Sequence, residues 1–298
     1  MLVQNIGDSF VCFNDECDVH IREYYLYCVS IVKKWIIKNE LKTNVIIGNY
    51  TVEFHNELKT FKIDIQCEHT LVKEGGRSVE NKIFGQTKHE DGNYLIRIDK
   101  FDYLNSLDCI IEYSLPNIFN ISSNPTFEEY LNKNVYISPI LYDVDFSNVE
   151  KNDVVTLFSV LENDRRQNFL TNLNDLKVPN INIDSLFSND SLLDLYKKTK
   201  ILINIHQTEH HHTFEELRVL PALLNGIIII SEDVPLKENI PYWEYIIWAK
   251  YEDVATKTLE VYNNYEKYYK KIFIDGELKQ ILKKMKKDNL NVFDKYIL

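Results

Sequence analysis

The amino-acid sequence predicts an α/β protein with two Rossmann-like domains that face each other across a cleft. Three observations support this fold class. Residues 201–232 read as a strand, a loop, a helix and a second strand. Apolar runs alternate with amphipathic segments along the whole chain, as in proteins with parallel sheets. Residues 138–153 interrupt this alternation, so we place the domains at residues 1–145 and 146–298.

The stretch at 201–232 gives the clearest pattern. Residues 201–205 and 227–230 are apolar and β-branched, which is typical of strands buried on both faces. A polar loop at 207–213 separates the first strand from an apolar-periodic segment at 214–225. Parallel sheets bind ligands beyond the carboxyl ends of their strands, so we expect the loop and the start of the helix to face an anionic ligand.

Local signals set the limits of this predicted helix. Thr213 is expected to act as its N-cap, with Glu215 and Glu216 in the first turn. Gly226 occupies the position where a helix C-terminus favours glycine.

In the first half, an amphipathic stretch at 20–39 predicts a helix that packs on a sheet. Strands are predicted at 9–13, 45–48, 63–67, 94–98, 109–113 and 135–137. Shorter helical segments are expected at 102–107 and 127–131.

The second half begins with a predicted strand at 154–160. Asn163 or Asp164 is expected to cap a helix that runs to about Leu176, and Asn189 or Asp190 to cap the next one. Beyond the central unit, a strand is predicted at 245–248 and helices at about 252–271 and 276–287.

Composition excludes several classes of protein. The net charge of −11 argues against a nucleic-acid binder, which needs a basic face. The five cysteines are an odd number without metal-ligand spacing, which argues against a disulfide framework. We find no secretion signal and no apolar run of the ~18 residues that a membrane span needs. A cytoplasmic protein is therefore expected, in the host cytoplasm if the chain is viral.

The second half resembles the nucleotide-sugar-binding half of GT-B glycosyltransferases. In that superfamily a helix ending in Ala-Leu-Leu-Asn-Gly precedes an apolar strand, a small residue and often an acid. Those features match residues 222–226, residues 227–230, Ser231 and Glu232. The resemblance is closest to small transferases of large DNA viruses and of bacterial capsule loci.

One feature of the family is absent. Its common retaining subgroup has two glutamates separated by seven residues, and this chain has Thr213 and Pro221 at those positions. Glu215, Glu216 and Arg218 would have to replace them, so the stereochemistry of transfer stays open.

The resemblance implies a metal-independent glycosyltransferase without a cofactor. It would move a sugar from a GDP- or UDP-linked donor to a hydroxyl of a glycan acceptor. The second domain would hold the donor and the first the acceptor, and the last helix would pack back on the first domain. Two alternatives remain: a non-catalytic nucleotide-binding module and a nucleotide-sugar epimerase. The oligomeric state is not predicted.

Arginines provide the predicted contacts to the donor diphosphate. Arg165 and Arg166 begin a predicted helix, where a cation opposes the helix dipole unless an anion binds there. Arg218 is assigned the same role. The competing interpretations are a solvated pair for the first two residues and a surface ion pair with Glu215 for the third.

A metal site is one interpretation of the histidine-rich loop at 207–213. Adjacent side chains such as His210, His211 and His212 converge on one ion only from an irregular backbone, so we predict no metal site. His206, His212 and Thr213 are instead assigned to the donor.

Carboxylates complete the predicted donor site. Glu215 and Glu216 would accept hydrogen bonds from sugar or ribose hydroxyls, and Glu232 would reach the ribose. The alternative for the first two is a simple interaction with the helix dipole.

An inverting transferase needs a base that takes the proton of the acceptor hydroxyl. His69 is the first candidate because its ordinary pKa lies near neutrality, and Glu68 and Asp102 are the others. A surface histidine beside a cap is the competing interpretation. The loop with Gly75, Gly76 and Arg77 is assigned to the acceptor or to a phosphate, although Gly-Gly is also a plain turn.

Overall fold

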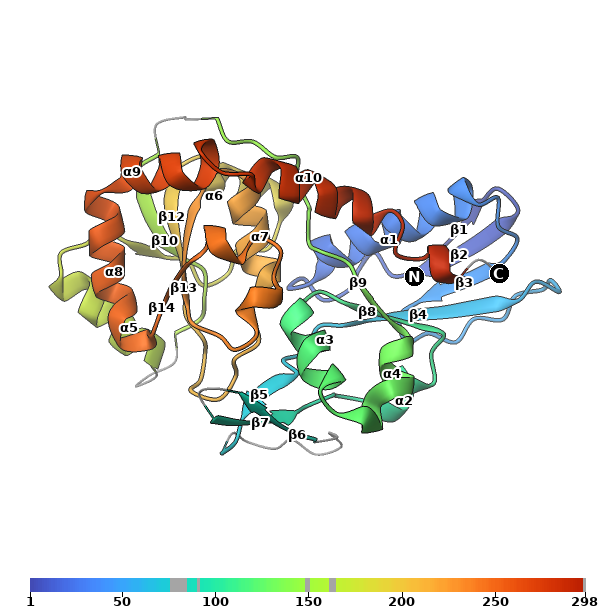
Figure 1. The fold of residues 1–298 in the computed structure, drawn as a ribbon. Helices are drawn as coiled ribbons and strands as arrows, with labels where there is room; N and C mark the ends of the chain where they lie inside the picture. The colour runs from blue at the N-terminus through green and yellow to red at the C-terminus, as the bar shows by residue number, and fades with distance from the viewer. Residues whose placement is uncertain (76–84, 90–91, 148–150, 161–164, 297–298) are drawn as a thin grey trace.

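The structure is a computed structural model that describes residues 1–75, 85–89, 92–147, 151–160 and 165–296. It contains two sheets with mainly parallel strands, one from each half of the chain, and a small antiparallel sheet below them (Figure 1). The chain is therefore an α/β protein, as the sequence predicted.

The first sheet is built from the first half of the chain. Its strands are β1 (Leu2–Ile6), β2 (Ser9–Phe13), β3 (Asn44–Ile47), β4 (Thr60–Gln66), β8 (Cys109–Glu112) and β9 (Asn134–Tyr136), in the order β1-β2-β3-β4-β8-β9. Only β1 is antiparallel to its neighbour. The parallel strands follow one another in chain order, so this sheet lacks the reversal of strand order that a doubly wound domain has.

Side-chain alternation in β8 explains why both faces of this sheet are covered. Ile111 packs in the core under α1, whereas Ile110 packs in a separate cluster on the other face. The helices of this half are α1 (Arg22–Lys38), α2 (Phe101–Asn105), α3 (Leu115–Ser122), the short 3₁₀ turn η1 (Pro125–Phe127) and α4 (Glu128–Asn132).

The second sheet is wholly parallel. Its strands are β10 (Asp153–Thr156), β11 (Ile181–Asn182), β12 (Thr199–Asn204), β13 (Ile228–Glu232) and β14 (Ile247–Ala249), in the order β11-β10-β12-β13-β14. Here the strand order reverses between β10 and β12, which is the point where doubly wound sheets bind ligands.

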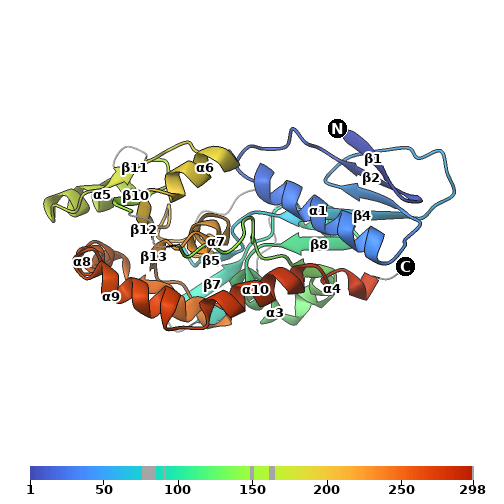
Figure 2. The same cartoon turned by 90° about the horizontal axis from the view of Figure 1, so that it is seen from above.

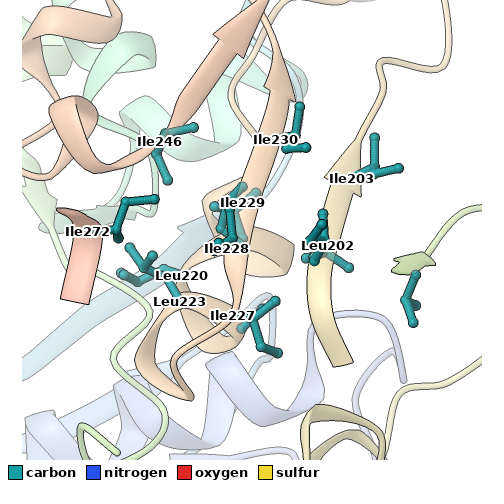
Figure 3. Close-up of a cluster of buried hydrophobic side chains, with 14 of the residues drawn as sticks. Leu202, Ile203, Leu220, Leu223, Ile227, Ile228, Ile229, Ile230, Ile246 and Ile272 are labelled. Carbon is teal, nitrogen blue, oxygen red and sulfur yellow. The ribbon is translucent and has the colours of Figure 1, made fainter. Parts of the chain in front are cut away.

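Helices surround the second sheet and close its core. They are α5 (Arg165–Asp175), α6 (Asn189–Tyr196), α7 (Glu216–Leu224), α8 (Tyr251–Asn263), α9 (Tyr265–Tyr269), the π-helix η4 (Lys270–Ile274) and α10 (Leu278–Asn289), with 3₁₀ turns η2 (Lys237–Asn239) and η3 (Trp243–Tyr245). Figure 3 shows Leu220 and Leu223 of α7 beside the isoleucines of β13, all of them inaccessible to solvent.

A third sheet connects the two halves. Its strands β5 (Leu71–Lys73), β7 (Gly92–Ile96) and β6 (Gln86–His89) are antiparallel in the order β5-β7-β6. The free edge of β5 pairs with the histidine-rich loop, because the Lys73 amide donates to the His210 carbonyl at 2.7 Å and the His212 amide donates to the Leu71 carbonyl at 3.0 Å. A loop of the second half thus continues a sheet of the first.

The C-terminal segment runs from the second sheet back to the first (Figures 1 and 2). At the end of α10, the Asn289 amide nitrogen donates to the Tyr27 hydroxyl at 2.9 Å and to the Ser138 carbonyl at 2.8 Å. Phe293 then enters the core of the first sheet beside Trp35, with ring centroids 5.5 Å apart. The 3₁₀ turn η5 (Asp294–Tyr296) ends the described chain.

The sequence missed the elements that lack apolar runs. These are β1, β5, β6, β11 and α3, all of them short. The edge strand β1 is exposed on both faces, and α3 begins with Leu115 and Pro116, directly after the predicted strand at 109–113. Proline at the start of a helix is favourable because the missing amide would be unpaired there.

The predicted N-caps of α7 and α6 were wrong, and that of α5 falls on residues outside the described ranges. Helix α7 begins at Glu216, with Glu215 at the N-cap, and Thr213 lies outside it. Ser188 caps α6 by accepting from the Ser191 amide, because its hydroxyl precedes the first helical residue. Asn163 and Asp164 lie outside the described residues.

One predicted strand also ends early, since β10 stops at Thr156 instead of residue 160. Across the described ranges, we find no helix of sufficient length and apolarity to span a membrane.

We expect Phe293→Ala to lower the free energy of unfolding by about 3–5 kcal/mol, because it leaves a cavity in the first core. Phe293 is 1% exposed. Urea unfolding followed by tryptophan fluorescence measures the loss. Leu290→Ala is the matched control, since Leu290 is 37% exposed and its truncation should cost less than about 0.5 kcal/mol. Equal losses of unfolding free energy in both variants would show that burial of Phe293 does not hold the C-terminal segment on the first core.

Candidate functional site

An arginine–glutamate pair joins two strand ends of the second sheet. Arg165, at the start of α5, donates two hydrogen bonds of 2.7 Å to the carboxylate of Glu232 at the end of β13. The same arginine donates to the His206 carbonyl at 3.2 Å, and the His206 amide donates to Glu232 at 3.0 Å. Both side chains are largely buried, at 13% and 8% exposure. Two of the predicted donor residues therefore meet, and they bind each other.

Arg166 has a different position from its neighbour. It is buried, donates to the Ile205 carbonyl at 3.2 Å and lies over the ring of Phe158 at 4.8 Å. The guanidinium therefore provides a hydrogen-bond donor for the carbonyl of Ile205, the residue that follows β12. Its contacts therefore stabilise the strand end.

A cavity, which we call the larger cavity to distinguish it from a smaller one described below, lies beside this strand edge. Its volume is about 810 Å³, and residues of the third sheet form one side while the segments after β13 and β14 form the other. His212 and Glu232 contribute to its wall. Four lysines also line it: Lys73, Lys88, Lys237 and Lys250. Four acidic residues line it as well, namely Glu232, Asp233, Glu238 and Glu252, and Lys237 pairs with Asp233 at 2.5 Å, so the cavity wall carries charges of both signs.

Four histidines from both halves form the histidine cluster, which we define as His69, His206, His211 and His212. The rings of His69 and His211 stack with centroids 5.3 Å apart, and those of His206 and His212 stack at 5.4 Å. The cluster connects the larger cavity, which His212 lines, with a smaller one lined by His69.

Hydrogen bonds determine the protonation of two cluster members. The Glu209 carbonyl lies 2.9 Å from Nε2 of His212, so that nitrogen donates, and Nδ1 is left to accept from the Tyr94 hydroxyl at 2.7 Å. Arg97 can only donate, so Nε2 of His211 accepts at 3.0 Å. Burial, followed by the nearby charge of His212, lowers the pKa of His206 well below its usual value. The lowered pKa keeps the ring of His206 neutral near pH 7.

His69 and Glu215 contact each other in the wall of the smaller cavity. Nε2 of His69 lies 3.2 Å from a carboxylate oxygen of Glu215. Burial acts to raise the pKa of Glu215, but the positive fields of His69 and Arg218 outweigh it, so the pKa is lowered and the group is ionised. Arg218 also lines this cavity and donates to the Asn204 side chain at 2.8 Å.

Glu216 lies close to Glu215 in the chain but has another environment. It is fully buried, and its carboxyl group accepts from the hydroxyls of Tyr136 at 2.7 Å and Tyr242 at 2.9 Å and from the Leu115 amide at 3.3 Å. Burial raises its pKa to about 7. Because its hydrogen bonds all go to protein groups, this residue joins the two halves and contacts neither cavity.

Thr213 belongs to a second buried connection. Its hydroxyl accepts from the Leu71 amide at 3.2 Å and donates to the Asn117 side chain at 2.9 Å. Asn117 in turn donates to Glu112 at 3.1 Å. Burial raises the pKa of Glu112 to about 8, and repulsion from Glu216 adds to this effect.

The other predicted acceptor-side residues are not brought together. Glu68 is 52% exposed, 3.8 Å from Arg97, and Asp102 is exposed on α2; neither lines one of the two cavities. Gly75 has a φ of +94° and lies against the ring of His210. Gly76 and Arg77 lie outside the described residues.

Sequence reasoning missed the lysines of the larger cavity and the buried Glu112. The lysines are scattered along the chain, and only the fold collects them. Glu112 had a visible signal, since it interrupts the apolar run of β8. Within the described ranges, no group of three or more histidine, cysteine or acidic side chains is arranged to hold a metal ion.

Comparison with known proteins gives one relative of this α/β chain. No family model matches it. The uncharacterized protein R358 of Acanthamoeba polyphaga mimivirus is 30% identical over 206 residues, which cover 66% of this chain and 71% of the relative. The chain belongs to the same protein family as this viral relative.

The raised pKa values of Glu112 and Glu216 predict that the free energy of unfolding depends on pH. Glu112 and Glu216 keep a proton when folded, with pKa values of about 8 and about 7, whereas the unfolded chain loses it near 4.5. Above that value the folded state binds more protons than the unfolded state, so the free energy of unfolding falls as pH rises and levels off above about 8. The slope reaches at most about 1.4 kcal/mol per pH unit for each group.

We expect Glu112→Gln to flatten this decrease between pH 5 and pH 8, as measured by urea unfolding at each pH. Glu129→Gln, at a residue 76% exposed on the surface, should leave the decrease unchanged. A decrease as steep in Glu112→Gln as in the wild type would contradict the assignment of a proton to Glu112.

Proposed function

We propose that this chain is a metal-independent glycosyltransferase of the GT-B type that binds a GDP- or UDP-linked sugar in the larger cavity. The observation that carries the proposal is the position of that cavity. It lies beyond the carboxyl ends of β13 and β14 in a parallel sheet, and its lining includes four lysines beside four acidic residues.

The size and charge of the cavity support a nucleotide-sugar ligand. Its volume of about 810 Å³ is in the range of pockets that enclose ligands larger than a single ring. Lysine ammonium groups bind phosphates as point charges, and they stabilise the negative charge that develops on a departing diphosphate. Transfer then needs no metal ion, because these cations supply the compensating charge.

Glu232 and His212 are the groups that would contact sugar or ribose hydroxyls. The Glu232 carboxylate already accepts from Arg165 and from the His206 amide. A carboxylate has about four acceptor positions, so one remains for a hydroxyl. Arg165 neutralises this carboxylate, so a diphosphate can approach with less repulsion.

His69 would act as the base that takes the proton of the acceptor hydroxyl. The carboxylate of Glu215 holds Nε2, which leaves Nδ1 as the nitrogen with a free electron pair. When this nitrogen accepts a proton, the imidazolium is stabilised by the same carboxylate. Nδ1 is buried without a hydrogen-bond partner in the described structure, and the base would need it to become accessible when the substrates bind.

Nucleotide binding tests the larger cavity. We expect GDP or UDP to raise the melting temperature, and Lys237→Ala and Lys250→Ala each to weaken binding about tenfold, or about 1.4 kcal/mol. Thermal shift and isothermal titration measure these changes. Lys197→Ala is the matched control, because Lys197 is 71% exposed and outside the cavity. Failure of both nucleotides to bind would remove the proposal.

Catalysis tests the proposed base. We expect His69→Ala to slow sugar transfer by about 10²–10⁴-fold, because the acceptor then loses its base, while nucleotide affinity stays the same. His55→Ala should have no effect, since His55 is exposed outside both cavities. Donor consumption with mixed hydroxyl acceptors, with and without EDTA, gives the rates. Nucleotide binding without any consumption would instead favour the non-catalytic binding module.

A further inference from the structure

The smaller cavity has a volume of about 270 Å³ and lies between the two halves of the chain. The start of α1 and the carboxyl ends of β4 and β8 line it from the first half. The segment after β11, together with α6 and α7, lines it from the second. It is one-third the size of the larger cavity, so it can hold a group of about one ring but not a nucleotide-sugar.

The wall of this cavity is mainly apolar. Six of the apolar side chains that line it are Ile21, Leu141, Leu157, Leu186, Phe187 and Leu192. Tyrosine rings contribute as well, but the hydroxyl of Tyr24 already donates to the Ile137 carbonyl at 2.7 Å. Burial also raises the pKa of the Cys67 thiol, which keeps this lining residue neutral.

The partly buried polar residues of the wall are His69, Glu215, Arg218 and Glu23, whereas His20 and Asp184 are exposed. The first three belong to one group, because Nε2 of His69 lies 3.2 Å from Glu215 and the field of Arg218 acts on the same carboxylate. The carboxylate of Glu23 accepts from the Asn189 side chain. The ring centroid of His20 lies 4.4 Å from that of Phe187, so this contact joins the start of α1 to the segment after β11. A ligand inside would meet apolar surface on most sides and the hydrogen-bonding groups around His69 on one side.

We infer that the smaller cavity binds the apolar or aromatic body of an acceptor with a single hydroxyl, such as a phenol, and directs that hydroxyl to His69. This inference rests on the proposed transferase function and names its acceptor class. A sugar acceptor fits less well, because each hydroxyl buried without a partner costs about 1–3 kcal/mol. Most of the residues that line the wall are apolar, so the several hydroxyls of a sugar would be buried largely against surface that offers no partner.

The transfer step balances with these groups. The acceptor oxygen forms a bond to the anomeric carbon of the donor sugar, and its proton goes to Nδ1 of His69. The bond from that carbon to the diphosphate oxygen breaks, and the nucleoside diphosphate leaves with the electron pair. His69 stacks on His211 with ring centroids 5.3 Å apart, and His211 is the neighbour in the chain of His212, which lines the larger cavity.

The test uses 4-methylphenol and methyl β-glucoside as probes, titrated into the full chain and followed by ligand-observed NMR and calorimetry. We expect 4-methylphenol to bind, and methyl β-glucoside to bind at least tenfold more weakly. Leu192→Trp fills the cavity and should weaken phenol binding at least tenfold. Leu193→Trp, on the same helix but outside the cavity lining, is the matched control and should leave binding unchanged. Melting temperatures confirm that both variants fold.

Several results would overturn the inference. They are no phenol binding to the wild type, unchanged binding in Leu192→Trp, equal losses in both folded variants, or tighter binding of the glucoside. If Leu192→Trp does not fold, Leu186→Trp fills the cavity from another segment. Nucleotide binding is measured in a separate titration. Phenol binding without nucleotide binding would support the assignment of the smaller cavity but would remove the transferase proposal.

Discussion

The pairing between β5 and the histidine-rich loop is the contact on which the described sites depend. Backbone hydrogen bonds join Lys73 to His210 and His212 to Leu71, so the two halves share one small sheet. The Thr213 hydroxyl extends this pairing into the buried network of Asn117 and Glu112. Because both cavities have walls from both halves, a change in this pairing would alter both of them.

Glu215 and Glu216, at the start of α7, have different environments. Glu215 is ionised and lies 3.2 Å from His69 at a cavity wall, whereas Glu216 is buried and accepts from two tyrosines. The residues are adjacent in the chain, but the turn into the helix directs their side chains to different surroundings. The pKa is therefore lowered for Glu215 and raised to about 7 for Glu216.

Charges of both signs meet at the larger cavity. The chain carries a net charge of −11, and four lysines and four acidic residues line this cavity. Arg165 and Arg166 bind Glu232 and backbone carbonyls. The two arginines therefore stabilise the strand ends beside the cavity.

The sequence determined the α/β class and most of the strands and helices, because apolar runs and helical periodicity are local and record which faces are buried. It also placed Glu232, His206 and His69 near strand ends. The tertiary structure alone decided that Thr213 bonds across the halves instead of capping α7, since both of its partners are distant in the chain. It likewise decided that Glu216 is buried and that the four lysines share one cavity. These outcomes depend on contacts between segments that no local pattern records.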